Sequence, residues 1–411
     1  MVSRLAVAAA LAVAAAAATL PMSATVPVSA EEPSTVTVSV VPDQDPFYAP
    51  PPDIGSLRNG QVVAGREIGT RLTVPVRAWQ VSYRTNDSLG NPELGVTTLL
   101  VPTAPWTGPG SRPAVSEQIP EDSTGTRCAP SYGIATGTLQ SGDQIAAMLA
   151  EGWAVAVPDF EGPKSAFLTG PQSGHAILDG VRAAGAFTPA GLGPDTRWAL
   201  DGYSGGAAAT GWAAELQPAY APELTFAGAA LGGVPASLPA VMNNVDGGVF
   251  SGFLVGVLVS YQREFPDARF DELLNERGRA DTAAAADACV IELLIRFPFW
   301  RLAAATADRY HDDTRLTEAL QRNSLGGAAP TMPILDYQSD SDEVVPVAQA
   351  DDLVAAWRRG GTTVVTVRDP SGEHAAEASK RQATAQQFLR ERFTGDLVAN
   401  ADLDRPVGPG R

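Results

Sequence analysis

The feature that most constrains the fold of this chain is a repeated alternation of short apolar runs with longer helix-forming stretches. The apolar runs are Ala114 to Ser116, Trp153 to Val157, Trp198 to Leu200, Phe226 to Leu231, Ile334 to Tyr337 and Thr363 to Val367. Helix-forming stretches separate most of them, at Gln144 to Leu149, Ala176 to Ala186, Ala207 to Leu216, Ala348 to Trp357 and Ala375 to Phe393. Strands that alternate with helices form a largely parallel, buried sheet flanked by those helices. The sequence therefore predicts an α/β fold.

Two segments outside this alternation predict additions to the core. Leu72 to Tyr83 and Leu94 to Val101 flank the turn-rich segment Asn86 to Pro92, a pattern typical of a β-hairpin. About a hundred residues separate the Phe226 to Leu231 run from Pro333, whereas a connection between a strand and a helix commonly takes roughly 2 to 6 residues. We therefore expect an inserted helical cap, or lid.

The N-terminal segment is typical of a secretory signal peptide. Arg4 is the only charged residue before Glu31, Leu5 to Leu20 is almost wholly Ala, Val and Leu, and Val28 to Ala30 offers small residues for cleavage. A membrane anchor is the alternative, but it needs about 20 strongly apolar residues, and this run is shorter and dominated by alanine. We expect a secreted, extracellular protein with cleavage after about Ala30.

Charge and cysteine content narrow the possible partners. The 29 Lys and Arg stand against 46 Asp and Glu, and the resulting net charge of −17 repels nucleic acid and anionic membrane surfaces. The two cysteines, Cys128 and Cys289, most simply pair in an exported chain, and two buried free thiols are the alternative. Neither belongs to a CxxC pair or lies near a histidine cluster, so we expect no metal or redox site.

The strongest chemical signal lies where one predicted strand meets the next helix. Arg197 to Asp201 leads into Gly202-Tyr203-Ser204-Gly205-Gly206, which matches the G-x-S-x-G pattern in its strand–turn–helix setting. Small residues are needed on both sides of Ser204 because the strained turn brings backbone segments close together. The pattern predicts Ser204 as a nucleophile, and a glycine-rich turn with an idle serine is the alternative.

A serine hydroxyl needs a base, and three histidines are candidates. His374 follows the Thr363 to Val367 strand, where an α/β-hydrolase carries its base, and it completes the order Ser, Asp, His. His175 precedes Ser204 at a predicted helix start and is interpreted as structural. His311 lies in a polar stretch typical of a solvated face. We therefore predict His374 as the base.

The acid that orients the base is expected in the loop after the preceding strand, Pro333 to Gln338. Asp340, Asp342 and Glu343 compete for this role. Asp342 is preferred because it stands just before apolar residues that can bury it beside an imidazole. Asp336 and Asp340 are expected to cap the element or to face solvent.

An oxyanion hole is expected from two backbone amides. Gly205, directly after the nucleophile, supplies the first. The second should come from Glu117 to Ser123, after the Ala114 to Ser116 run, but this segment has no HGGG-type motif. Spacing alone does not choose the residue.

Several motifs along the chain resemble those of the secretory lipase family. They are Asp45-Pro46-Phe47-Tyr48, Glu121-Asp122-Ser123 with Cys128-Ala129-Pro130-Ser131, Pro158 to Pro163, Leu178 to Ala183, Gly202 to Gly206 with Tyr220 to Leu224, and Asp342 to Pro346. The similarity runs over nearly all of the chain after the predicted leader.

This resemblance implies an α/β-hydrolase fold with a helical lid and the triad Ser204, Asp342 and His374. It also implies Asp122 as the second contributor to the oxyanion hole and a bridge between Cys128 and Cys289. The chain departs from the family at Gly205, where many members have Gln, and it lacks a second cysteine pair near the C terminus. The departure at Gly205 leaves its amide in place and bears on the substrate range.

The predicted cap has an apolar centre, Val249 to Val259, and a second apolar run, Val290 to Phe299. Both are interpreted either as ordinary core helices of the cap or as the lining of an acyl tunnel. Gly252 and Gly256 leave gaps on an otherwise apolar helix, where an acyl chain or another helix can approach. They are therefore candidate substrate-binding residues.

Together these features predict a secreted serine lipase or esterase that hydrolyses triacylglycerol-type lipid esters through an acyl-enzyme, without cofactor or metal. A short-chain carboxylesterase and an acyltransferase are alternatives at the same site, and a non-catalytic surface binding protein is an alternative from another class. The expected partners are a lipid or ester substrate and, transiently, a lipid interface, and the sequence sets no oligomeric state. The predicted organisation is a signal peptide (1–30), an extended arm (31–70), the first part of the core (71–232), the cap (233–330), the second part of the core (331–395) and a tail (396–411).

Overall fold

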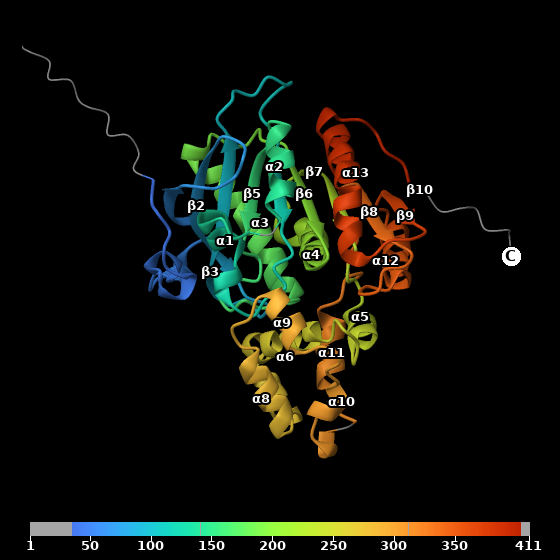
Figure 1. Cartoon of the computed structure of the whole chain (residues 1–411). Helices are drawn as coiled ribbons and strands as arrows, with labels where there is room; N and C mark the ends of the chain where they lie inside the picture. The colour runs from blue at the N-terminus through green and yellow to red at the C-terminus, as the bar shows by residue number, and fades with distance from the viewer. Residues whose placement is uncertain (1–34, 140, 311, 404–411) are drawn as a thin grey trace, which may run out of the picture. The chain divides into compact units, whose positions relative to one another are not determined.

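The computed structural model describes residues 35–139, 141–310 and 312–403. The predicted signal peptide, residues 1–30, and His311 lie outside the described residues. Within the described ranges the chain forms a ten-stranded sheet in the order β1-β2-β3-β5-β4-β6-β7-β8-β9-β10 (Figure 1). No helix in these ranges is both long enough and apolar enough to cross a membrane.

The sheet is antiparallel at one side and parallel elsewhere. Its strands are β1 (Val62–Ile68), β2 (Val76–Asn86), β3 (Pro92–Pro102), β4 (Ala114–Gln118), β5 (Ala154–Pro158), β6 (Trp198–Tyr203), β7 (Phe226–Gly232), β8 (Ile334–Ser339), β9 (Val364–Asp369) and β10 (Ala401–Leu403). The pairs β1–β2, β2–β3 and β3–β5 are antiparallel, and every pair from β5 across to β10 is parallel. The predicted hairpin is β2 with β3, and the predicted mostly parallel sheet is confirmed.

Helices cover both faces of the sheet (Figure 1). One face packs against α1 (Pro130–Thr136), α2 (Gly142–Ala150) and α13 (His374–Thr394). The other face packs against α3 (Gly170–Ala186), α4 (Gly205–Tyr220) and α12 (Val347–Arg359). Along β6, Ala199 belongs to the first apolar layer and Leu200 to the second, as the two-residue period of a strand requires.

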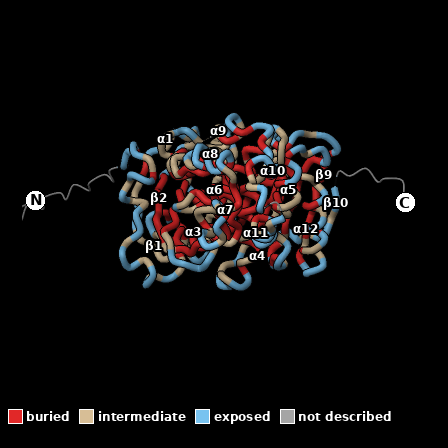
Figure 2. The backbone as a smooth tube through the Cα atoms, turned by 90° about the horizontal axis from the view of Figure 1, so that it is seen from below, coloured by how far each residue is buried: buried red, intermediate tan, exposed pale blue. Residues whose placement is uncertain are grey.

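Between β7 and β8 the chain forms the predicted helical insertion. Its helices are α5 (Leu238–Val245), α6 (Gly252–Glu264), α7 (Phe270–Leu273), α8 (Glu276–Ala284), α9 (Val290–Arg296), α10 (Leu302–Ala305) and α11 (Arg315–Arg322). They enclose a separate apolar cluster, which also takes in Phe167 after β5 and Val344 and Val345 after β8. Figure 2 views the molecule from this side, with α6 at the buried centre. The cap therefore packs onto the carboxyl ends of the parallel strands.

The structure corrects the prediction at both edges of the sheet. The described part of the predicted arm, residues 35–70, is not simply extended, because it contains β1 and the short 3₁₀ turns Pro42–Gln44, Pro46–Tyr48 and Ile54–Ser56. The described part of the predicted tail 396–411, residues 396–403, contains β10. Both are edge strands: β1 is mostly exposed or half-buried and lacks a long apolar run, and β10 is too short to show periodicity.

Candidate active site

Ser204 occupies the sharp turn between β6 and α4. It has a φ of 56°, a backbone conformation that residues with a side chain rarely adopt. A Cβ added at Gly202 would lie 2.5 Å from the carbonyl oxygen of Gly206, and one added at Gly206 would lie 1.9 Å from the carbonyl oxygen of Gln118. The close approach of three backbone segments is therefore the physical reason for the glycines around Ser204.

Ser204, His374 and Asp342 form one hydrogen-bonded chain. His374 is the first residue of α13, and its Nε2 lies 2.8 Å from Oγ of Ser204. Its Nδ1 lies 2.7 Å from Oδ2 of Asp342, in the loop after β8. The three side chains meet because β6, β8 and β9 are parallel and end at the same edge of the sheet.

The Asp342 carboxylate is fixed by its own loop. Its Oδ1 accepts hydrogen bonds from the backbone N–H of Val344 at 3.0 Å and of Val345 at 2.7 Å. Its Oδ2 accepts from Nε2 of Gln338 at 3.2 Å, and the side chain is fully buried. A carboxylate at Nδ1 orients the imidazole so that Nε2 faces the serine hydroxyl.

The competing acids lie elsewhere. Asp340 is exposed, and Glu343 is exposed and accepts a hydrogen bond from the backbone N–H of His374 at 3.0 Å. The prediction that Asp336 caps the element or faces solvent is wrong, because Asp336 is fully buried and forms an ion pair with Arg368. It lies in β8, between β7 and β9, where every side chain of the strand is buried.

His175 makes contacts that suit its structural interpretation, although it is the sixth residue of α3 and not at the helix start. Its Nδ1 lies 3.3 Å from the carbonyl oxygen of Asp87, and its ring packs against Tyr220 with centroids 4.3 Å apart. Burial lowers the pKa of the imidazole. The first contact joins α3 to the turn of the β2–β3 hairpin, and the second joins α3 to the end of α4.

Tyr203 is a site residue that the sequence analysis did not select. Its hydroxyl donates to the carbonyl oxygen of His374 at 2.5 Å, and the two rings are 5.2 Å apart. It therefore fixes the N-terminus of α13, where His374 lies. The signal was present, because Tyr203 fills the first variable position of the G-x-S-x-G pattern.

Asp122 lies against Gly205 in the loop after β4. It has a φ of 46° and is 5% exposed. A Cβ added at Gly205 would lie 1.9 Å from Oδ1 of Asp122, and this oxygen has no hydrogen-bond partner among the described residues. Burial raises the pKa of the Asp122 carboxyl to about 7, and a protonated His374 opposes that rise. The loop thus holds a readily protonated carboxyl beside the residue that follows Ser204.

Two cavities of different character reach Ser204. A narrow apolar crevice of about 20 Å³ runs under the cap and is lined by Phe167, Val241, Met242 and Phe253. A wider cavity of about 600 Å³ opens on the side of α1 and α13, and its lining is more polar, including Glu121, Arg127 and Tyr132. Ser204, Asp122 and Phe253 border both cavities. The site can therefore receive two different groups on the two sides of one reacting centre.

Gly252 and Gly256 face helix α9. A Cβ added at Gly252 would lie 2.4 Å from the carbonyl oxygen of Leu293, and one at Gly256 would lie 3.1 Å from Cδ1 of the same leucine. The sequence allows either an acyl chain or another helix to approach these glycines, and the structure has the helix. In this structure both glycines therefore pack against α9, and a Cβ at Gly256 would also lie 3.6 Å from Cδ1 of Phe167.

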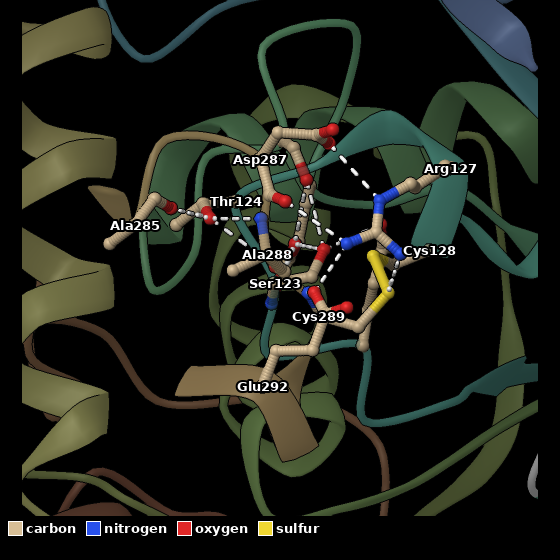
Figure 3. The surroundings of a disulfide bond; sticks show 12 residues. Ser123, Thr124, Arg127, Cys128, Ala285, Asp287, Ala288, Cys289 and Glu292 are labelled. Atoms are coloured by element: carbon tan, nitrogen blue, oxygen red, sulfur yellow. Dashed lines mark hydrogen bonds and ion pairs between the residues drawn. A yellow bond between two sulfur atoms is a disulfide. The ribbon is translucent and has the colours of Figure 1, made fainter. Parts of the chain in front are cut away.

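Cys128 and Cys289 form a disulfide, as the sequence predicts for two thiols in an exported chain (Figure 3). The bond joins the 3₁₀ turn Thr126–Cys128 to the N-cap of α9. Beside it, the Arg127 guanidinium donates to the carbonyl oxygen of Asp287 at 3.0 Å and pairs with the Glu292 carboxylate. Across the described part of the chain no group of three or more His, Cys, Asp or Glu is arranged to hold a metal ion.

Comparison with known proteins shows similarity to one family. A sequence model of the secretory lipase family matches residues 133–400. Lipase 2 of Candida albicans is 34% identical, over 86% of this chain and 81% of that protein. Secreted triacylglycerol lipase LIP4 of Malassezia globosa is 32% identical, over 87% and 83%. A protein of Mycobacterium tuberculosis named as a probable inactive lipase is 33% identical, over 87% and 83%.

A solved structure agrees with the sequence relatives. Candida antarctica lipase A has a TM-score of 0.83 to this chain at 28% identity, over 88% of each chain. The α/β-hydrolase fold that the motifs implied is thereby confirmed.

Proposed function

Because the chain belongs to the secretory lipase family and is a lipase-type ester hydrolase, we propose that it cleaves triacylglycerol-type esters through a Ser204–His374–Asp342 triad. The supporting observation is the pair of contacts at His374, 2.8 Å to Oγ of Ser204 and 2.7 Å to Oδ2 of Asp342. Both lie within the roughly 2.6 to 3.2 Å over which a proton can be passed.

In the proposed reaction Oγ of Ser204 attacks the ester carbonyl carbon while Nε2 of His374 takes its proton. The tetrahedral intermediate expels the alcohol, which receives that proton, and an acyl-enzyme remains on Ser204. Water then attacks the acyl carbonyl with His374 again as the base, and the acid is released. Asp342 holds the ring and stabilises the imidazolium that forms in each step.

The oxyanion of each tetrahedral intermediate is proposed to bind between Gly205 and Asp122. The backbone N–H after a nucleophile commonly supplies one donor, and the loop after the third core strand supplies the other. The raised pKa of Asp122 supports this assignment, because a neutral carboxyl places no negative charge beside a developing oxyanion.

We propose that the apolar crevice takes the acyl group and that the wider, more polar cavity takes the leaving alcohol. Apolar walls stabilise an acyl chain by roughly 0.8 kcal/mol per buried CH₂, and alcohol or glyceride oxygens keep water or polar partners in the wider space. The crevice of about 20 Å³ is far too small for a long chain in this conformation. A long substrate therefore requires the cap to move as a lid.

That narrow crevice favours one second candidate, a carboxylesterase for short acyl chains. Short esters need no movement of α5 or α6, whose Met242 and Phe253 line the crevice. The two candidates share every step at Ser204 and differ only in the length of acyl chain accepted.

We also propose that residues 1–30 are a leader cleaved after about Ala30. Membership of a secretory family, a relative named as secreted and the disulfide all support an extracellular protein. The core is proposed to comprise 71–232 and 331–395 with the cap at 233–330, to which the edge strands β1 and β10 are added.

The test is hydrolysis of p-nitrophenyl esters from C2 to C16 and of emulsified triglyceride, with stoichiometric fluorophosphonate labelling of Ser204. A lipase cleaves the long esters and the emulsion, whereas a short-chain esterase cleaves only C2 to C4. Addition of a long-chain alcohol distinguishes an acyltransferase from a hydrolase, because an acyltransferase passes the acyl group to the alcohol and yields a new ester in place of the free acid. Absence of labelling in the wild-type protein, with a Ser204→Ala control, would indicate a non-catalytic protein.

A further inference from the structure

The loop that carries Asp122 is hydrogen-bonded to a segment of the cap. Thr124 is 2% exposed and donates its backbone N–H to the carbonyl oxygen of Ala288 at 2.9 Å. Its Oγ1 donates to the carbonyl oxygen of Ala285 at 2.5 Å and accepts from the N–H of Ala288 at 3.1 Å. One buried threonine thus joins the two segments by three hydrogen bonds (Figure 3).

Three further contacts close the same junction. Arg263 of α6 donates to the carbonyl oxygen of Thr124 at 2.7 Å and also to that of Ala286. A Cβ added at Gly125 would lie 2.2 Å from Oδ1 of Asp287, so the loop passes very close to the cap. The Cys128–Cys289 disulfide then links the two segments covalently.

The opposite side of the loop is held by the core. Ser123 donates its backbone N–H to both carboxyl oxygens of Glu161 at 3.3 Å and its hydroxyl to Oε2 at 3.1 Å. Asp122 therefore lies directly before two residues that are held from opposite sides. Its φ of 46° is a strained conformation for aspartate, and such strain persists only where the surroundings over-determine it.

We propose that the cap segment 285–289, acting through Thr124 and the disulfide, positions the loop that stabilises the oxyanion. This inference rests on the proposed function, because an oxyanion forms only if Ser204 attacks an ester. Thr124 is a positioning residue, because its hydrogen bonds join it to Ala285, Ala288 and Arg263 and not to the reacting atoms. The cap is then part of the catalytic geometry as well as a wall of the acyl site.

A positioning role predicts a loss that appears in the transition state and not in substrate binding. The oxyanion is absent from the bound ester, so a displaced loop lowers kcat while KM is kept. Deletion of one oxyanion donor costs about 10²- to 10³-fold in kcat, and a displaced donor should cost less, roughly 10- to 100-fold.

The experiment compares Thr124→Val with Thr124→Ser in the purified protein. Valine keeps the shape and removes the hydroxyl, and serine restores the hydroxyl. Thr282→Val is the matched control, because Thr282 is a buried cap threonine whose hydroxyl bonds only to carbonyls of its own helix, Gly278 and Arg279. The double variant Cys128→Ser/Cys289→Ser tests the covalent link. Each protein is assayed for kcat and KM on p-nitrophenyl acetate, for thermal unfolding, and for inhibition by a trifluoromethyl ketone.

The ketone isolates the oxyanion. Oγ of Ser204 adds to its carbonyl carbon, His374 takes the proton, and the former carbonyl oxygen becomes the oxyanion. We expect Thr124→Val to lose roughly 10- to 100-fold in kcat and in ketone affinity together, with KM within about two-fold. Thr124→Ser should recover most of the kcat and of the ketone affinity, and Thr282→Val should lose neither. The loss in the double cysteine variant should lie between those of Thr282→Val and Thr124→Val.

Folded Thr124→Val protein that keeps kcat and ketone affinity within two-fold overturns the inference. So does a loss of equal size in Thr282→Val, which would make the effect a general weakening of the cap. If wild-type protein neither turns over ester nor labels at Ser204, the proposed function has failed, independently of what Thr124 does.

Discussion

Replacement of Gly206 by alanine tests the turn around Ser204 most directly. A Cβ at this position lies 1.9 Å from the carbonyl oxygen of Gln118 and 2.9 Å from its carbonyl carbon, where ordinary contact begins at 3.4 Å. Both atoms are backbone at the end of β4, so rotating a side chain gives no relief. The start of α4 and the end of β4 must separate by about 3.4 − 1.9 = 1.5 Å.

This separation moves Ser204 and the loop of Asp122 apart, because one precedes α4 and the other follows β4. Misplacement by about 1 Å costs on the order of 10²-fold in rate, and overpacking a buried contact costs about 1 to 3 kcal/mol of stability. We therefore expect Gly206→Ala to lose 10²-fold or more in kcat/KM, at about 1 to 3 kcal/mol of unfolding free energy.

The assay is p-nitrophenyl acetate hydrolysis with the active sites titrated by a fluorophosphonate, alongside urea unfolding. Gly185→Ala is the matched control, since Gly185 also lies in a helix of the core and a Cβ there meets nothing within 4 Å. That variant should gain about 0.5 to 1 kcal/mol of stability and keep its activity. If folded Gly206→Ala protein keeps kcat/KM within a few fold, the steric account of the turn is refuted.

Three further predictions follow from other contacts. Ser204→Ala and His374→Ala should each lower kcat by on the order of 10⁴-fold or more with unchanged unfolding curves, because triad members act as a unit, and a comparable loss in His175→Ala instead would move the base to that residue. The Cys128→Ser/Cys289→Ser variant should unfold at lower urea, by about 2 to 4 kcal/mol, because the bond closes a loop with a sequence separation of 161, and an unchanged midpoint contradicts this. Stability should fall as pH rises from 5 to 8. Burial raises the pKa of Asp122, Asp159 and Asp201 to about 7, while these groups ionise near about 3.9 in the unfolded chain, so the native state holds protons that the unfolded chain has released. Acids with lowered pKa, such as Asp369, have completed their titration below this range. His175, whose pKa burial lowers, acts in the opposite direction, but it is one group against three. A urea midpoint higher at pH 8 than at pH 5 is the contrary result.

The parallel strands were predictable because both of their faces are buried. β6, β8 and β9 are buried along their whole length, so their sequences contain compact apolar runs between helical stretches. The edge strand β1 is half-buried or exposed at every position except Ile68 and has no such run. Helix α1 was not predicted for a different reason: its seven residues are too few to show a helical period of apolar positions.

The candidate triad was predictable because the strands that carry it were predictable. Ser204 sits in a strand–turn–helix pattern, and His374 and Asp342 each follow a recognisable strand, so topology alone brings them to one edge. Asp336 shows the limit of this reasoning. A carboxylate inside a buried strand needs a partner, and Arg368 of β9 is the partner of Asp336. Asp336 pairs in the sheet with Thr366, two residues before Arg368, so the ion pair can be predicted only once the register of β8 and β9 is known.

The junction between the Asp122 loop and the cap could not be predicted from the sequence, because most of its hydrogen bonds go to backbone atoms. Thr124 and Arg263 bond to backbone carbonyls of Ala285, Ala286 and Ala288, and every residue has such a carbonyl. The partner side chains are alanines, so neither charge nor periodicity marks them as a binding segment. What the sequence does mark is the pair of cysteines that lie directly beside the junction. The disulfide joins the loop of the proposed oxyanion hole to an insertion with a sequence separation of 161, and the hydrogen bonds of Thr124 connect the same two segments.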